Sequence, residues 1–270
     1  MKTIIITIIV ALIIGFLLGL LLGVFKKLFA VKTDPKVEQI RNALSGANCG
    51  GCGYAGCDAF AEAVANGTAL PTGCIAGGAG VAGAIAKILG VEAGSLDKKV
   101  TILACQGNCN VALHKGIYQG VQTCKAAQLT VNGTKVCPSG CIGLGDCVNV
   151  CPFDALSISK EGLPVVDYSK CTGCGKCVKE CPKHLFSIES AALKGSKALC
   201  SNRTTEKAQI RKYCTSGCFK CGLCTKKCPE QCIVLDNGIP KVDYSKCTSC
   251  GECVKACPDH VLKLVQEIVK

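Results

Sequence analysis

Cysteine is the residue type in this sequence whose number and spacing could do chemistry. The 270-residue chain has 26 cysteines, no tryptophan and 4% aromatic residues. Cysteines separated by two or three residues present several sulfurs from one loop to one centre, whereas a disulfide needs two sulfurs that meet singly. Four stretches repeat such a spacing: CIGLGDCVNVCPFDALSI from Cys141, CTGCGKCVKECPKHLFSI from Cys171, CFKCGLCTKKCPEQCIVL from Cys218 and CTSCGECVKACPDHVLKL from Cys247.

Three of these stretches contain the complete Cys-x2-Cys-x2-Cys-x3-Cys-Pro run. In such a run three sulfurs bind one four-iron cluster, and the fourth, ahead of proline, reaches the cluster of the partner motif. The second pair of motifs therefore predicts one cluster on Cys218, Cys221, Cys224 and Cys257 and another on Cys247, Cys250, Cys253 and Cys228.

The first pair departs from the pattern, because Leu144 stands where a second cysteine is expected. Cys137, four residues upstream of Cys141, could supply the missing ligand. We therefore predict one cluster on Cys137, Cys141, Cys147 and Cys181, and another on Cys171, Cys174, Cys177 and Cys151.

An earlier stretch, NCGGCGYAGC, adds Cys49, Cys52 and Cys57, with Cys74 further on. Four thiolates also suit zinc, so this group alone leaves zinc open. The neighbouring motifs favour a four-iron cluster here, which makes five. Cys105, Cys109 and Cys124 could supply three ligands of a sixth; the alternative for them, and for the unassigned Cys200, Cys214 and Cys232, is that they are buried free thiols.

The elements that must position these cysteines predict an α+β fold. Residues 37–44, 58–66 and 80–90 read as helices, residues 100–105 as a strand, and LPVVDYSK and IPKVDYSK as hairpin-like links within each motif pair. The expected division is a transmembrane anchor (1–26), a four-cysteine [4Fe–4S] domain with linker (27–95), a cysteine-containing spacer (96–135) and two ferredoxin-like modules with two clusters each (136–190 and 191–270).

Residues 3–25 run 23 positions without a charge, long enough to cross the hydrocarbon core of a bilayer. A cleaved signal peptide is the alternative, but its apolar region is normally shorter. Only Lys2 precedes this segment, whereas Lys26, Lys27, Lys32 and Lys36 follow it. The positive-inside rule therefore predicts a single-pass protein of the inner (cytoplasmic) membrane with the bulk of the chain in the cytoplasm. Gly15, Gly19 and Gly23 could pack against another membrane helix.

The formal net charge of +12 could suggest a nucleic-acid partner. A four-iron cluster with four thiolates carries about −2, so five clusters would leave roughly +2. No nucleic-acid-binding motif is present, and no sequence pattern indicates a catalytic site for hydride transfer or hydrolysis. We therefore interpret the basic excess as compensation for buried anionic clusters.

The order of anchor, four-cysteine domain, spacer and two ferredoxin-like modules resembles the B subunit of the Rnf complex in its long form. The resemblance implies an electron carrier within an ion-translocating ferredoxin:NAD+ oxidoreductase, with soluble ferredoxin as donor, other membrane subunits as partners, and Na+ or H+ translocation. Two alternatives stay open: an anchored polyferredoxin that serves a hydrogenase or a corrinoid-activating enzyme, and a structural or metal-storing cysteine protein.

Overall fold

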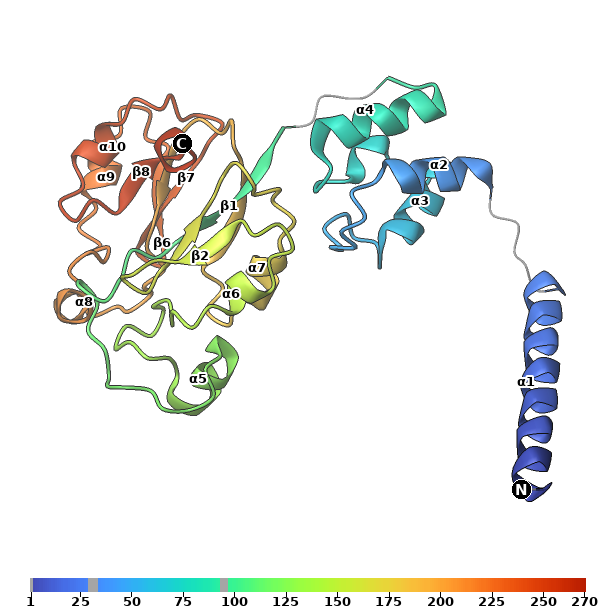
Figure 1. The fold of residues 1–270 in the computed structure, drawn as a ribbon. Helices are drawn as coiled ribbons and strands as arrows, with labels where there is room; N and C mark the ends of the chain where they lie inside the picture. The colour runs from blue at the N-terminus through green and yellow to red at the C-terminus, as the bar shows by residue number, and fades with distance from the viewer. Residues whose placement is uncertain (1, 29–33, 93–96) are drawn as a thin grey trace.

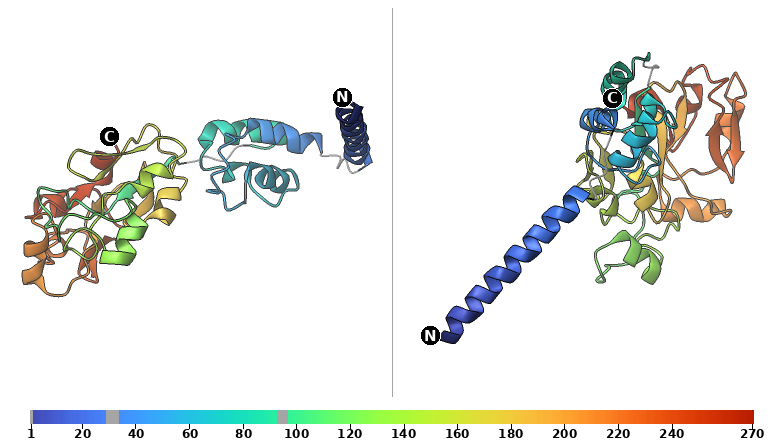
Figure 2. Two further views of the ribbon diagram at one scale, coloured as in Figure 1. Left: turned by 60° about the horizontal axis from the view of Figure 1, so that its bottom comes forward. Right: turned by 90° about the vertical axis from the view of Figure 1, so that its right-hand side faces the viewer.

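The computed structural model describes residues 2–28, 34–92 and 97–270, which form a long helix, a small helical unit and a body built from two similar modules (Figure 1). The helical unit lies between the long helix and the body in the left view of Figure 2. Lys32 and the side chains of Lys2, Lys26 and Lys27 lie outside the described part of the chain.

The long helix α1 spans Lys2–Leu28. Its segment Ile4–Phe25 has a mean hydropathy of 3.2, and none of the most apolar window is buried within the chain. An apolar helix without a polar face has no stable place in water but suits a bilayer. Helix α1 is therefore long and apolar enough to cross a membrane, as the sequence predicts. Apart from the backbone of α1 itself, no atom of the described residues lies within 4 Å of a Cβ added at Gly15, Gly19 or Gly23, so their packing role stays a prediction.

The helical unit comprises α2 (Pro35–Ala43), α3 (Cys57–Ala65), the 3-10 helix η1 (Pro71–Gly73) and α4 (Gly78–Leu89). These bounds confirm the three helices that the sequence predicts in this region. Asp34 begins α2 by accepting a hydrogen bond from the Lys36 backbone N–H at 2.8 Å. The core of the unit is small and includes Ile40, Phe60 and Ile85, which are almost fully buried.

Each module of the body contains two antiparallel strand pairs. The first module pairs β1 (Lys99–Leu103) with β4 (Phe186–Ser190) and β2 (Leu156–Ile158) with β3 (Pro164–Val166). The second pairs β5 (Ser196–Ala198) with β8 (Leu262–Leu264) and β6 (Ile233–Asp236) with β7 (Ile239–Val242). Strand β1 comes from the stretch that the sequence assigns to the spacer. Because β1 pairs with β4 as β5 pairs with β8, β1 belongs to the first module.

Short helices complete the modules: α5 (Cys124–Val131), α6 (Asp146–Asn149), α7 (Lys176–Glu180), α8 (Lys207–Tyr213), α9 (Leu223–Lys226), α10 (Glu252–Lys255) and α11 (Val265–Ile268). Helices α6, α7, α9 and α10 each carry the cysteine at the third ligand position of a motif, namely Cys147, Cys177, Cys224 and Cys253. Each follows a glycine with φ between 73° and 86°, a left-handed conformation that favours glycine. The glycine ahead of each helix thus turns the chain so that the cysteines before and after it face one centre.

The two modules share a small apolar contact. Ile102 of β1 is 1% exposed and packs with Leu199 and with Val265 of α11. Because these residues come from both modules, the modules form one body.

Replacing Ile102 with alanine should destabilise the whole body, because truncating a buried isoleucine costs about 2–5 kcal/mol. The thermal unfolding midpoint of the anaerobically purified chain, followed by circular dichroism, should fall by several degrees. The matched control is Ile117→Ala, since Ile117 is 91% exposed. Equal midpoints for the two variants would contradict a shared core.

Candidate metal centres

The cysteines of the described chain gather at six sites with four assigned to each; Cys232 is a fifth cysteine at the last site, and Cys109 lies outside all six. We name the groups by position: the N-terminal site (Cys49, Cys52, Cys57, Cys74), site 1a (Cys151, Cys171, Cys174, Cys177), site 1b (Cys124, Cys141, Cys147, Cys181), the bridging site (Cys105, Cys137, Cys200, Cys214), site 2b (Cys218, Cys221, Cys224, Cys257) and site 2a (Cys228, Cys247, Cys250, Cys253).

The N-terminal site is formed by the loop ahead of α3, by the first residue of α3 and by the residue after η1. Asn48 holds this loop by accepting a hydrogen bond from the Cys57 backbone N–H at 2.8 Å. Burial raises the pKa of Cys74, and the nearby charges of Cys49, Cys52 and Cys57 raise it further. The thiols of Cys49, Cys52 and Cys57 are thus close enough to Cys74 to influence it.

Sites 1a and 2a occupy equivalent places in the two modules. Burial raises the pKa of Cys177 to about 11, with further increases from Cys171, Cys174 and Cys151. Thr101 Oγ1 of β1 lies 3.5 Å from Cys177 Sγ in site 1a. Ser196 Oγ of β5 lies 3.1 Å from Cys253 Sγ in site 2a. The first strand of each module thus supplies a hydroxyl to the same position of its site.

The four cysteines of site 2b line one cavity. Its four cysteines are those that the regular motif assigns to one cluster. Burial raises the pKa of Cys218 and Cys224 to about 11, so a bound cation is needed to hold them as thiolates near neutral pH. Lys220 lines the same cavity, and its Nζ donates to Asn237 O at 3.0 Å.

Site 1b differs from the grouping expected from the sequence, because Cys124 rather than Cys137 lines its cavity. Helix α5 directs its first residue into the cavity, where Leu144 leaves the place of a thiol unfilled. The buried carboxylate of Asp146 fixes this arrangement by accepting hydrogen bonds from the backbone N–H groups of Cys124, at 2.8 Å, and Lys125, at 3.1 Å. Burial raises the pKa of Cys147 to about 12, and the charge of Cys124 is the next cause.

Cys137 instead lines the cavity of the bridging site, together with Cys105, Cys200 and Cys214. This site takes two cysteines from each module, and the two pairs are equivalent. Cys105 and Cys200 each stand two residues after the first strand of their module. Cys137 and Cys214 each stand four residues before the first cysteine of a motif, in the related sequences CPSGC and CTSGC.

Each module also supplies one equivalent hydrogen bond from a backbone N–H group to a sulfur of the bridging site. The backbone N–H of Cys141 points to Cys105 Sγ at 3.5 Å, and that of Cys218 points to Cys200 Sγ at 3.4 Å. Backbone N–H groups that point at sulfur are typical of the surroundings of iron–sulfur clusters.

Two buried donors at the bridging site have no hydrogen-bond partner among the described residues: Lys135 Nζ and Asn202 Nδ2. Lys135 is 3% exposed and Asn202 is 2% exposed, and both line the cavity. A buried ammonium group without an anion is costly. These donors and the four thiols therefore fit an anionic group such as a four-iron cluster.

The spacing of the thiols favours clusters over single ions. Within residues 2–28, 34–92 and 97–270, no three Cys, His, Asp or Glu side chains are grouped as one metal ion would require. Zinc needs all its ligands about 2.3 Å from one atom, whereas each thiolate of a cubane binds a different iron. The cysteines of sites 1b, 2b and 2a and of the bridging site stand around one cavity each.

The three cysteines that the sequence groups as ligands of a sixth cluster are separated in the structure. Cys105 lies in the bridging site and Cys124 in site 1b. Cys109 is exposed, with its Sγ 3.6 Å from Asn110 Oδ1. One sequence signal indicates the bridging site: Cys137 and Cys214 each stand four residues before the first cysteine of a motif. This signal becomes visible only when the alignment of the repeated motifs is extended upstream of them.

Two family models match cysteine-rich parts of the chain. The family described as "Putative Fe-S cluster" matches residues 44–76, and the family described as "4Fe-4S dicluster domain" matches residues 140–185 and 217–261. These matches cover the N-terminal site and the four repeated cysteine motifs of the two modules.

Individual relatives extend the similarity over more of the chain. The B subunit of the Na(+)-translocating ferredoxin:NAD(+) oxidoreductase complex of Acetobacterium woodii is 42% identical over 82% of this chain and 66% of its own length. The B subunit of the proton-translocating ferredoxin:NAD(+) oxidoreductase complex of Clostridium ljungdahlii is 42% identical over 81% of this chain and 77% of its own length. The B subunit of an ion-translocating oxidoreductase complex of Methanosarcina acetivorans is 40% identical over 52% of this chain and 53% of its own length. The chain therefore belongs to the family of B subunits of the ion-translocating ferredoxin:NAD+ oxidoreductase complex, the Rnf complex.

Proposed function

We propose that this chain carries electrons from reduced ferredoxin through six [4Fe–4S] clusters toward NAD+ reduction, coupled to the movement of Na+ or H+ by other membrane subunits. The observation that carries the proposal is an unbroken series of four-cysteine sites, each next to another. The names of the relatives, which include ferredoxin, NAD(+) and a translocated ion, support the donor, acceptor and coupling.

The series begins where the helical unit meets the first module. A side chain added at Gly51 would lie 3.0 Å from Cys174 O, so this backbone approaches site 1a closely. The charge of Cys49 contributes to the raised pKa of Cys174, after burial as the main cause. The N-terminal site and site 1a are therefore neighbours, and Gly51 permits the approach.

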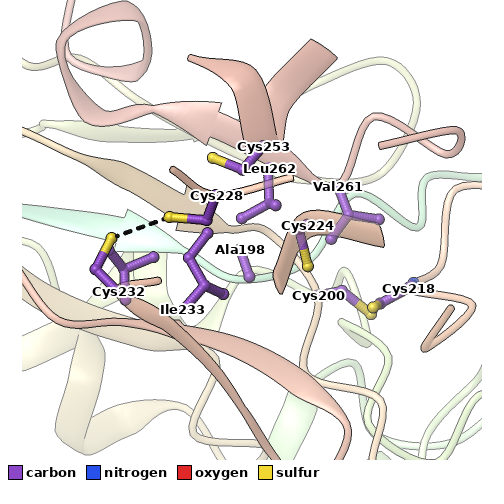
Figure 3. Packing of buried hydrophobic residues seen from close by; sticks show 11 residues of the cluster. Ala198, Cys200, Cys218, Cys224, Cys228, Cys232, Ile233, Cys253, Val261 and Leu262 are labelled. Carbon is purple, nitrogen blue, oxygen red and sulfur yellow. Dashed lines mark hydrogen bonds between the residues drawn. The ribbon is translucent and has the colours of Figure 1, made fainter. Parts of the chain in front are cut away.

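The series continues through the body. The charge of Cys177 in site 1a contributes to the raised pKa of Cys147 in site 1b, after burial and the thiols of site 1b itself. The hydrogen bonds of Cys141 to Cys105 and of Cys218 to Cys200 join the bridging site to sites 1b and 2b. Sites 2b and 2a share one core (Figure 3). The bridging site is thus the link through which electrons would pass between modules.

The two ends of the series suggest where electrons enter and leave. Cys221 and Cys250, in the second module, are exposed. A soluble donor could approach clusters there, whereas the N-terminal site belongs to the unit next to α1. We infer that ferredoxin docks on the second module and that electrons leave toward the membrane, with the body on the cytoplasmic side of the inner membrane.

The ligands that we propose are the 24 cysteines of the six sites. This assignment moves Cys137 from site 1b to the bridging site and places Cys124 in site 1b. The two cysteines could instead serve one cluster, and a double variant distinguishes these arrangements.

Replacing Cys124 with alanine should remove or convert the cluster at site 1b. Replacing Cys137 with alanine should remove or convert a different cluster, the one at the bridging site. The anaerobically purified chain should contain about 24 irons and 24 sulfides, and each variant should lose between about one and four irons. The double variant should lose roughly twice as many, and Cys109→Ala should lose none. Equal losses for the single and double variants would place both cysteines at one cluster and contradict the assignment.

Reduced ferredoxin mixed anaerobically with the full-length chain in detergent should be reoxidised while the visible absorbance of the chain's clusters decreases. Electron paramagnetic resonance of the same mixture should show reduced four-iron clusters. A chain that contains zinc without sulfide, or clusters that ferredoxin leaves oxidised, would contradict the proposed function.

A further inference from the structure

Site 2a contains a fifth cysteine. Cys232, at the start of the second hairpin, is 4% exposed and lines the same cavity as the four cysteines of the site. Its Sγ lies 3.4 Å from Cys228 Sγ, and Figure 3 shows the two sulfurs facing each other. Five thiols therefore surround a cavity where a cubane needs four.

The internal repeat shows that the backbone does not require cysteine here. Four residues after each cysteine that precedes proline, the other motifs have Ala155, Leu185 and Val261, all buried. The residue before each of these positions has a φ between 46° and 50°, namely Asp154, His184, Gln231 and His260. The carbonyls of Ala155 and Cys232 accept equivalent hydrogen bonds, each of 2.8 Å, from the backbone N–H groups of Asp167 and Asp243.

In the last motif, too, the residue four positions after the cysteine that precedes proline lies beside the sulfur of that cysteine. The backbone N–H of Val261 lies 3.3 Å from Cys257 Sγ, so the residue there stands directly beside the cysteine ahead of proline. A buried cysteine can act merely as a small apolar residue. At this position, however, its sulfur is held against a sulfur that the motif assigns to a cluster.

We propose that Cys232 is a reserve ligand of the cluster at site 2a and can take the place of Cys228. This inference rests on the proposed presence of a four-iron cluster at that site. In the exchange, one bond from iron to Cys228 Sγ breaks and one bond from the same iron to Cys232 Sγ forms. The proton of the Cys232 thiol moves to the released Cys228 sulfur, and no electron is transferred.

The exchange needs little movement of the chain. Cys228 and Cys232 are joined by one tight turn, in which the Gln231 backbone N–H donates to Cys228 O at 3.2 Å. Site 2a also includes the exposed Cys250, so its cluster is among those most open to solvent and oxidants. A second thiol at this site would keep the cluster bound when Cys228 is lost or chemically modified.

The first module provides a matched control, because Cys151 is equivalent to Cys228 but has Ala155 in place of Cys232. We expect Cys228→Ala to keep about 24 irons and sulfides per full-length chain, with the four-iron resonance signals retained. Cys151→Ala should lose between about one and four irons. The double variant Cys228→Ala, Cys232→Ala should show a loss similar to that of Cys151→Ala.

A gain of ligand tests the idea in the opposite direction. Adding Ala155→Cys to Cys151→Ala should restore the iron and sulfide content to that of the unaltered chain. An iron loss in Cys228→Ala equal to that in Cys151→Ala would overturn the reserve role of Cys232. It would not contradict the assignment of six clusters to the unaltered chain. A chain that contains no iron or sulfide before any substitution would instead overturn the proposed function.

Discussion

The structure depends on one constraint: four thiolates must be held at the corners of a cubane inside a chain with little else to form a core. The core of the second module consists largely of cysteines, with Ile233, Val261 and Leu262 beside them. Short strands and one-turn helices give such modules few apolar contacts, and bound metal commonly supplies the missing stability. We therefore regard folding and cluster binding in this chain as one process.

The same constraint explains the arrangement of charge. Six clusters of about −2 each would offset the formal charge of +12. Lys135 places one compensating charge inside the body, at the bridging site, where Asn202 adds a second buried donor. A cluster shared by two modules would also fix their relative position, in addition to the contact of Ile102 with Leu199 and Val265.

Sequence reasoning predicted the parts that are local. Each regular motif contains three ligands of one cluster at fixed spacing and one ligand of the partner cluster, and the hairpins and the first three helices after the anchor follow from nearby residues. Site 1b and the bridging site could not be predicted in this way. Cys124 reaches site 1b because Asp146, 22 residues later, holds its backbone. The bridging site combines residues from both modules, so its composition depends on how the modules pack.

The most direct test is an anomalous scattering map, measured at the iron absorption edge from anaerobically grown crystals of the full chain. We expect six four-iron peaks, one of them enclosed by Cys105, Cys137, Cys200 and Cys214. Five peaks with no iron among these four cysteines, or a cluster bound by Cys137 together with Cys141, Cys147 and Cys181, would contradict the six-cluster arrangement.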